Sequence, residues 1–310
     1  MAIKTYLSLI IPCLNEEASI PLFYKNVLLV FENFDFKYEF IFVDDGSQDN
    51  TLHILKELSE KDSCVHYVSF SRNFGKEAAL LAGMQVAKGD YIVTLDVDGQ
   101  DPPSLIPQML EAVSSNEFDC AGTRRVTRKG EPPVRSFFAR CFYSLMKRIT
   151  DIDIVDGARD FRLMNRKYLE AILALPERSR FSKGIFPWIG FRVKWFKYEN
   201  IERKAGETKW SFWKLFLYSF DGIIAFSTKP LAIASIMGIL LFLTSLLGII
   251  IIVIRKIIWD NSAFGWASMV CIILLCSGVQ LFASGILGQY LAKIYTEVKQ
   301  RPYYIIKETR

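Results

Sequence analysis

Two aspartates separated by one residue directly follow a short apolar run, and this arrangement predicts chemistry more plainly than any other in the chain. Residues 91–95 have the length and apolar character of a strand buried on both faces. Because side chains alternate along an extended chain, Asp96, Asp98 and Gln100 point the same way if the extension continues past residue 95. Such oxygens suit Mg²⁺ or Mn²⁺, which commonly keep positions open for phosphate oxygens. The alternative is a solvated turn in which Asp-Gly and Pro-Pro end the strand.

Short apolar runs alternate with helical patterns along the first part of the chain and place these aspartates at the end of a predicted strand. The strand candidates are residues 7–11, 40–43, 65–70, 91–95 and 119–123, and the helical patterns lie near residues 18–31, 51–60, 76–87 and 105–115. This alternation predicts an α/β fold with a mainly parallel sheet covered by helices on both faces. In open sheets of this kind, ligands bind beyond the carboxyl ends of the strands.

Polar segments follow each of the first four predicted strands, so we expect them to converge at one edge of the sheet. They are residues 12–17, 44–47, 71–76 and 96–98. The second segment has a purely structural alternative, because Ser47 and Asp49 suit helix capping and Asp45-Gly46 is typical of a turn. Four polar loops at one end of a sheet nevertheless favour a shared site over four independent turns.

Two long stretches without a charged residue predict transmembrane helices. They cover residues 231–254 and 264–290, and at about 1.5 Å per residue each can cross a hydrocarbon core of roughly 30 Å. Basic residues precede the first stretch and follow the second, whereas the loop between them has only Arg255 and Lys256. The positive-inside rule therefore predicts that both termini are cytoplasmic. The alternative is a pair of buried core helices, for which charge-free runs of this length are unusual.

These patterns divide the chain of 310 residues into four parts. We expect a cytoplasmic α/β domain at residues 1–208, interfacial amphipathic helices at 209–229, two spans of the cytoplasmic membrane with a short external loop at 230–291, and a cytoplasmic tail at 292–310. The aromatic and basic residues at 210–218 favour a helix at the level of lipid headgroups, with a helix packed on the α/β domain as the alternative. The net charge of +5 suits anionic lipids or phosphates but is too small to predict nucleic-acid binding.

Several motifs in a fixed order resemble those of glycosyltransferase family 2, in particular its polyprenyl-phosphate branch of dolichyl-phosphate mannose synthases and bactoprenol glucosyltransferases. The resemblance is carried by residues 8–12 (SLIIP), 15–16 (NE), 43–47 (VDDGS), 71–76 (SRNFGK), 96–103 (DVDGQDPP), 160–164 (DFRLM), 203–210 (RKAGETKW) and 295–303 (YTEVKQRPY). It covers essentially the entire chain. A lone Asp-x-Asp would be weak support, whereas this ordered set is specific.

The resemblance implies a GT-A (Rossmann-like) catalytic domain that passes a sugar from a nucleotide-diphosphate sugar to a lipid-linked phosphate. The nucleotide sugar would be bound by Pro12, Asn15, Glu17, Asp44, Asp45, Lys76 and Asp96. The metal, Mg²⁺ or Mn²⁺, would be held by Asp96, Asp98 and Gln100. The ending Gln-Asp-Pro-Pro is closer to the bacterial polyprenol glucosyltransferases, which favours a UDP-linked sugar. We expect glucose, with N-acetylglucosamine or another hexose as alternatives.

The remaining predicted site residues would serve the acceptor and the reaction. Asp160 matches the usual candidate base of the family, but a phosphate monoester has a second pKa near about 6 and is already mostly anionic at neutral pH, so Asp160 could instead position the acceptor. Lys209 and Arg203 are candidates for stabilising the leaving diphosphate, or else for binding lipid headgroups. Arg124 and Arg135 are our candidates for contacts to polyprenyl (undecaprenyl) phosphate, because arginine forks suit phosphate.

One displacement suffices and no covalent nucleophile is evident, so inversion at the anomeric carbon is expected. The product would supply a sugar for a cell-envelope glycan. One alternative is a processive polysaccharide synthase, which usually needs more spans and a Gln-x-x-Arg-Trp element that the sequence lacks. Another is a non-catalytic membrane scaffold or flippase subunit. Gly285 and Gly288 allow a close helix–helix contact, so the sequence is also compatible with a homo-oligomer.

Overall fold

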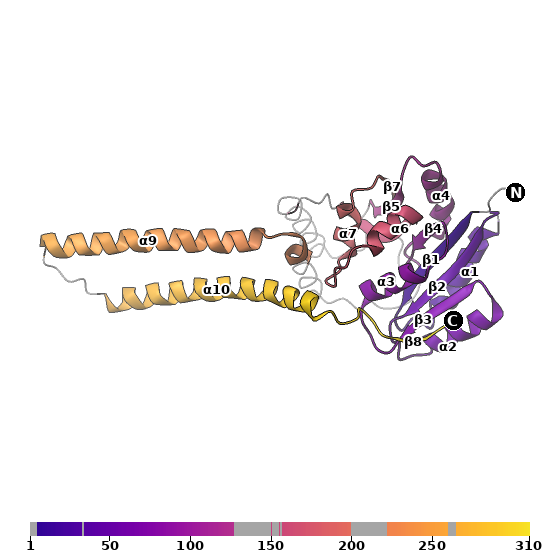
Figure 1. Ribbon diagram of the computed structural model, residues 1–310, viewed down its shortest axis with the longest axis horizontal. Helices are drawn as coiled ribbons and strands as arrows, with labels where there is room; N and C mark the ends of the chain where they lie inside the picture. The colour runs from indigo at the N-terminus through magenta and orange to yellow at the C-terminus, as the bar shows by residue number, and fades with distance from the viewer. Residues whose placement is uncertain are drawn as a thin grey trace. The chain divides into compact units, whose positions relative to one another are not determined.

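The structure is a computed structural model, and it describes residues 5–32, 34–126, 150, 155, 157–199, 222–259 and 265–310. The chain divides into two units. The first comprises Met1–Ser219 together with Arg301–Arg310, and the second comprises Phe220–Gln300. The first is an α/β unit built on one sheet, and the second contains two long helices (Figure 1).

The first unit is built on an eight-stranded sheet with the order β7-β5-β6-β4-β1-β2-β3-β8. The strands are β1 (Tyr6–Cys13), β2 (Lys37–Asp44), β3 (Val65–Phe70), β4 (Tyr91–Thr94), β5 (Cys120–Arg125), β6 (Ala158–Asn165), β7 (Val193–Tyr198) and β8 (Ile306–Thr309). The neighbouring strands β4, β1, β2 and β3 run parallel, as does the pair of β5 and β7. Strand β6 is antiparallel to β4 and β5, and β8 is antiparallel to β3. The predicted α/β fold with a mainly parallel sheet is confirmed.

Helices pack on both faces of this sheet because its central strands are apolar on both sides. The helices are α1 (Ile20–Phe31), α2 (Thr51–Lys61), α3 (Lys76–Val86), η1 (Pro103–Leu105), α4 (Ile106–Ser114), α6 (Arg166–Leu173) and α7 (Ser182–Trp188). Leu9 of β1 joins Phe23 of α1 and Met109 of α4 in one core cluster. On the opposite face of β1, Ile10 meets α3 at Gly83, where an added Cβ would lie 2.3 Å from Ile10 Cγ2. Glycine is therefore required for this close approach.

The predicted strands and helices of the first 125 residues are confirmed with small shifts at their ends, whereas β6, β7, β8, α6 and α7 were not predicted. Strand β6 contains the motif of residues 160–164, and Asn165 ends it and caps α6 by accepting a hydrogen bond from the Tyr168 N–H at 2.8 Å. The adjacent polar residues Arg159 and Asp160 interrupt the alternation of apolar and polar side chains by which a strand is recognised in a sequence. Strand β8 is a four-residue element near the end of the chain that pairs with β3.

The second unit contains helices α9 (Lys229–Trp259) and α10 (Trp266–Lys299). Within them, Lys229–Ile254 and Ile272–Lys299 are long and apolar enough to cross a membrane, with mean hydropathies of 2.9 and 1.7. Large apolar side chains on both helices are exposed, among them Ile252 and Leu281. Length and composition therefore agree with the predicted spans.

Candidate active site

The polar segments that follow β1 and β2 are joined by hydrogen bonds, so the predicted convergence of these loops is confirmed. The Asn15 N–H donates to Ser47 Oγ at 2.9 Å, and Asn15 Oδ1 accepts from the Gln48 N–H at 2.8 Å. The Asn50 N–H donates to Glu17 Oε2 at 2.9 Å. Asn15 and Glu17, which were predicted to bind the nucleotide sugar, thus also fix the shape of this loop. Pro12, predicted for the same role, is paired with Val43 inside the sheet.

Asp44 and Asp45 at the end of β2 are buried and accept hydrogen bonds from uncharged groups. Asp44 accepts from the Ser47 N–H at 3.0 Å and from the Ser69 hydroxyl at 2.8 Å. Asp45 accepts from the N–H groups of Phe74 at 2.6 Å and Gly75 at 2.9 Å. Burial raises the pKa of Asp45 above its ordinary value, although these backbone hydrogen bonds oppose the shift. Asp45 therefore braces the loop that precedes α3, and its predicted contact with a nucleotide stays a prediction.

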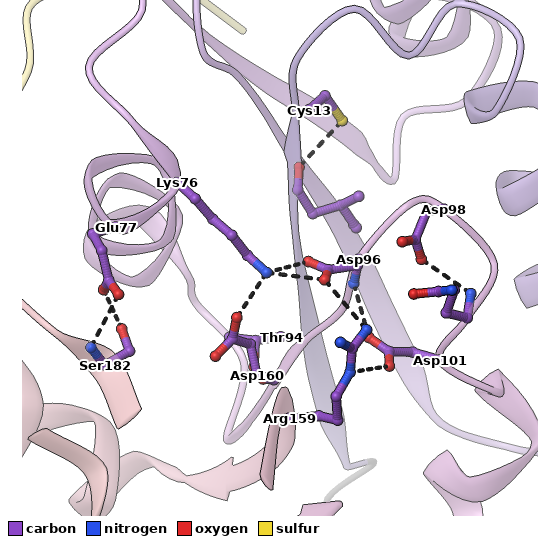
Figure 2. Close-up of polar contacts among 12 residues, drawn as sticks. Cys13, Lys76, Glu77, Thr94, Asp96, Asp98, Asp101, Arg159, Asp160 and Ser182 are labelled. Atoms are coloured by element: carbon purple, nitrogen blue, oxygen red, sulfur yellow. Dashed lines mark hydrogen bonds and ion pairs between the residues drawn. The ribbon is translucent and has the colours of Figure 1, made fainter. Parts of the chain in front are cut away.

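Lys76 joins two of the predicted site aspartates, which come from different strands. Its Nζ lies 2.7 Å from Asp96 Oδ1 and 2.7 Å from Asp160 Oδ2 (Figure 2). Lys76 is the first residue of α3, Asp96 follows β4 and Asp160 lies in β6. Burial alone would lower the pKa of Lys76, but the charges of Asp160 and Asp96 raise it well above its usual range. Lys76 is therefore a permanent cation between two carboxylates.

Arg159 and Asp101 extend this network on the side of Asp96 away from Lys76 (Figure 2). Arg159 Nη2 lies 3.8 Å from Asp96 Oδ2, and Arg159 Nε lies 3.5 Å from Asp101 Oδ1. The Tyr198 hydroxyl donates to Asp101 Oδ1 at 2.9 Å. Burial raises the pKa of Asp101, with the Arg159 charge opposing the shift. Asp96 is thus flanked by two cations.

Asp160 is held ionised by the positive charges around it. Burial would raise its pKa, but the charges of Lys76, Lys183 and Arg159 outweigh burial and hold the pKa well below its usual range. Lys183 follows Ser182, whose backbone N–H donates to Glu77 Oε1 at 3.0 Å, so α7 is joined to the start of α3 beside this cluster. A carboxylate in such surroundings is a poor proton acceptor near neutral pH.

The turn that carries Asp98 and Gln100 is not an extension of β4, so the condition for side-chain alternation past residue 95 is not met. The strand ends at Thr94, and Gly99 has a φ of 72°. Asp98 Oδ1 accepts from the Gln100 N–H at 3.0 Å, and Gln100 Oε1 accepts from Arg125 Nη2 at 2.8 Å. The chain turns at Gly99 and brings Asp98 onto the backbone of Gln100, as the alternative of a turn at Asp-Gly predicted.

The side-chain oxygen atoms at this turn are suitable ligands for a hard divalent cation. Asp96 and Asp98 offer carboxylate oxygens and Gln100 an amide oxygen, which Mg²⁺ and Mn²⁺ accept as ligands. Within the described part of the chain, no group of three or more His, Cys, Asp or Glu side chains is placed to hold a metal. A metal here would therefore need oxygen atoms beyond these carboxylates, such as the Gln100 amide or phosphate oxygens.

Several predicted site residues lie outside the described residues, and several residues of the network were not predicted. Arg135, Arg203 and Lys209 belong to the first group, as does most of the predicted interfacial segment at 209–229. The unpredicted members of the network are Asp101, Arg125, Arg159 and Lys183. Arg159 adjoins the predicted Asp160, and Arg125 belongs to the basic stretch that begins at the predicted Arg124. The predicted contact of Arg124 with the acceptor stays a prediction.

Comparisons with known proteins identify the family. The model of the family described as Glycosyl transferase family 2 matches residues 8–173. The chain is 39% identical over 303 residues to the SfII prophage-derived bactoprenol glucosyl transferase of Shigella flexneri, and the alignment covers 98% of each chain. It is 40% identical over 302 residues to the uncharacterized glycosyltransferase YkcC of Bacillus subtilis strain 168, covering 97% of this chain and 93% of the relative.

A solved structure shares the fold of the α/β unit. It is glucosyl-3-phosphoglycerate synthase from Mycobacterium tuberculosis in complex with Mn²⁺, uridine diphosphate and phosphoglyceric acid. The TM-score is 0.51 at 19% identity, over 72% of this chain and 77% of that chain. This likeness supports the GT-A fold. With the family match over more than half of the chain and the near full-length relatives, it follows that the chain belongs to glycosyltransferase family 2 and is a glycosyltransferase.

Proposed function

We propose that this glycosyltransferase moves glucose from UDP-glucose to polyprenyl phosphate, with inversion at the anomeric carbon. Polyprenyl phosphate is proposed as the acceptor because the chain is 39% identical, over 98% of both chains, to a protein named bactoprenol glucosyl transferase. That alignment includes the two long apolar helices as well as the α/β unit. N-acetylglucosamine or another hexose is the alternative donor sugar.

The cations around Asp96 are the groups that would meet the donor diphosphate. Cleavage of a sugar–diphosphate bond leaves negative charge on the departing diphosphate, so the enzyme must supply positive charge there. Lys76 and Arg159 both lie within 4 Å of Asp96. A divalent metal held by Asp96, Asp98 and Gln100 would neutralise and orient the diphosphate when bound. The Lys76 ammonium group can then contact the phosphates while it keeps its contact with Asp160.

Asp160 would position the acceptor phosphate without taking up its proton. Its pKa is held well below the usual range by Lys76, Lys183 and Arg159, while the acceptor phosphate is already mostly dianionic above a second pKa of about 6. The role of a classical base is therefore superfluous. The negative charge of Asp160 instead keeps Lys76 and Lys183 in place, and Lys183 together with Arg124 and Arg135 would contact the acceptor phosphate.

The two long helices and the nature of the proposed acceptor support placement of the protein in a membrane. Helices α9 and α10 expose apolar side chains over lengths sufficient to span a bilayer, and polyprenyl chains reside in the hydrocarbon core. The basic flanks predict a cytoplasmic α/β unit, where nucleotide sugars are available. The two candidate spans among the described residues are too few to enclose a polymer channel, so we propose transfer of one sugar per acceptor.

A transfer assay tests this proposal. Membranes that contain the protein are incubated with Mn²⁺, polyprenyl phosphate and a panel of labelled nucleotide sugars, and the chloroform-soluble product is identified by mass spectrometry. We expect a hexosyl polyprenyl phosphate from UDP-glucose, and none from matched membranes that contain the Asp96→Asn variant. Labelled lipid from another donor alone would overturn the assigned sugar, and no labelled lipid from any donor would overturn the assigned acceptor.

A further inference from the structure

The last ten residues of the chain are part of the α/β unit and not a free tail. Strand β8 pairs antiparallel with β3, and Arg310 and Tyr67 exchange backbone hydrogen bonds of 3.0 and 3.2 Å. Lys56 Nζ of α2 lies 2.7 Å from Glu308 Oε2. The segment that follows α10 thus completes the edge of the sheet beside β3 (Figure 1).

Two tyrosines just before β8 fix this segment to the unit through their side chains. The Tyr303 hydroxyl donates to the Pro176 carbonyl oxygen at 2.9 Å. The Tyr304 ring stacks on Phe70 with centroids 4.7 Å apart and an interplanar angle of 15°, and its hydroxyl contacts Gln85 Oε1. Phe70 is the last residue of β3 and is fully buried. The stack therefore lies at the point where the chain leaves the sheet for the active-site loop.

A continuous set of contacts leads from this stack to Lys76. The Ser71 N–H donates to the Ile305 carbonyl oxygen at 3.0 Å. Phe70 packs edge to face against Phe74, with centroids 5.8 Å apart. The N–H groups of Phe74 and the next residue, Gly75, then donate to Asp45, and Lys76 begins α3. Tyr304 thus supports the loop of residues 71–75 from one side, and Asp45 holds it from the other.

We infer that Tyr304 is a positioning residue for donor binding: its ring holds Phe70 and Phe74 so that the loop of residues 71–75 sets Lys76 between Asp96 and Asp160. Removal of the ring loosens the loop and spreads the positions of the Lys76 ammonium group. Donor binding weakens because part of the binding energy must then order the loop. The rate of the bound complex changes less, since the reacting groups themselves are retained.

The test compares Tyr304→Ala and Tyr304→Leu with Tyr304→Phe in the full-length protein. Tyr304→Phe keeps the ring and loses the hydroxyl, whereas Tyr304→Leu keeps apolar bulk without a stacking face. Glu308→Gln is the matched control, because it lies in the same segment but contacts Lys56, away from the loop. The readouts are hydrogen exchange of the peptide that contains Phe74 and Gly75, the KM for UDP-glucose, and kcat.

We expect faster hydrogen exchange of the loop in Tyr304→Ala and Tyr304→Leu. The KM of both variants should rise by roughly three- to tenfold, because the energy of one lost aromatic pair corresponds to about that factor in affinity. Their kcat should stay within about twofold of the parent, and Tyr304→Phe and Glu308→Gln should resemble the parent in all three readouts. Unchanged loop exchange and KM in Tyr304→Ala would overturn the inference. So would a Tyr304→Phe variant as impaired as Tyr304→Ala, because the hydroxyl and not the ring would then be responsible.

The KM readout rests on the proposed function, whereas the exchange readout does not. If the parent itself transfers no sugar from UDP-glucose, the proposed donor fails. Loop exchange in the same variants still decides whether Tyr304 holds the loop.

Discussion

Aspartates follow both β2 and β4, but their partners differ. After β2, the buried Asp44 and Asp45 accept hydrogen bonds from backbone N–H groups and a hydroxyl. After β4, Asp96 is flanked by the charged groups of Lys76 and Arg159. Burial raises the pKa of Asp45, while the surrounding cations hold the pKa of Asp160 well below its usual range. The same residue type at the same edge of the sheet is therefore used in two ways.

The difference separates what holds the loops from what can respond to a ligand. The hydrogen bonds from backbone N–H groups to Asp45 should stay in place when a diphosphate binds, because an anion attracts an uncharged N–H group less strongly than it attracts a cation. The ion pairs of Lys76 and Arg159 are different, since phosphate oxygens and a divalent metal compete directly for their partners. We therefore regard the β2 end as the brace and the β4 end, with Asp160 beside it, as the reactive half of the site.

The largest effect is expected from Asp160→Asn, which removes a charge from the reactive half and retains the shape of the side chain. Turnover should fall by roughly 100- to 1,000-fold, the cost commonly seen when one electrostatic group of an active site is lost. The measurement is kcat for transfer to polyprenyl phosphate. The control is Asp90→Asn, at an exposed aspartate that accepts from the Tyr6 N–H where β1 begins, and it should stay within about twofold of the parent. An Asp160→Asn variant within a few-fold of the parent would remove Asp160 from the reaction.

Asp45→Ala should affect stability more than chemistry. The N–H groups of Phe74 and Gly75 lose their acceptor, and leaving such groups unsatisfied costs roughly 1 to 3 kcal/mol. We expect a lower Tm of the purified protein in detergent, with the fraction that remains folded still binding Mn²⁺ and UDP. Loss of turnover without any loss of Tm would place Asp45 in the reactive half and erase the distinction.

The smallest effect concerns how pH changes the stability of the two halves. The folded pKa of Asp45 is raised, so its carboxyl group contributes most to stability in acid, and that contribution is lost as the pH rises through the folded pKa. The folded pKa of Asp160 is depressed, so its contribution is complete above the unfolded value and declines only in stronger acid. Between pH 7 and pH 4, the Tm loss caused by Asp45→Asn should therefore grow, while that caused by Asp160→Asn should stay constant. A Tm loss that changes equally with pH in both variants would contradict this assignment.

Much of this site follows from the sequence because the motifs sit where parallel strands end. The loops after β1 and β2, and Asp96 after β4, were expected at one edge of the sheet and lie there. The ion pair of Lys76 with Asp160 was not foreseen, since it joins residues 84 positions apart through β6, an unpredicted strand. At Asp98 the sequence left two alternatives open, a continued extension and a turn, and the structure has the turn that Asp98-Gly99 indicates.

The C-terminal strand could not be predicted from the sequence for a different reason. Strand β8 has four residues, and its partner β3 lies more than two hundred residues earlier in the chain. Such a short segment has too few side chains for a periodic pattern, and its pairing depends on the edge that β3 presents. The contacts of Tyr304 with Phe70 and Gln85 depend on the same long-range pairing.

Whether Lys76 pairs with Asp96 until a diphosphate and a divalent metal compete for that contact is tested by the binding of Mn²⁺, measured by electron paramagnetic resonance with and without UDP. Asp96 already pairs with Lys76 and Arg159, so we predict weak binding of Mn²⁺ alone and binding at least about tenfold tighter with UDP. Lys76→Gln should strengthen binding of Mn²⁺ alone, and Lys76→Arg should not. Equal Mn²⁺ affinity with and without UDP in the parent, together with no gain in Lys76→Gln, would show that Lys76 does not compete with the metal for Asp96.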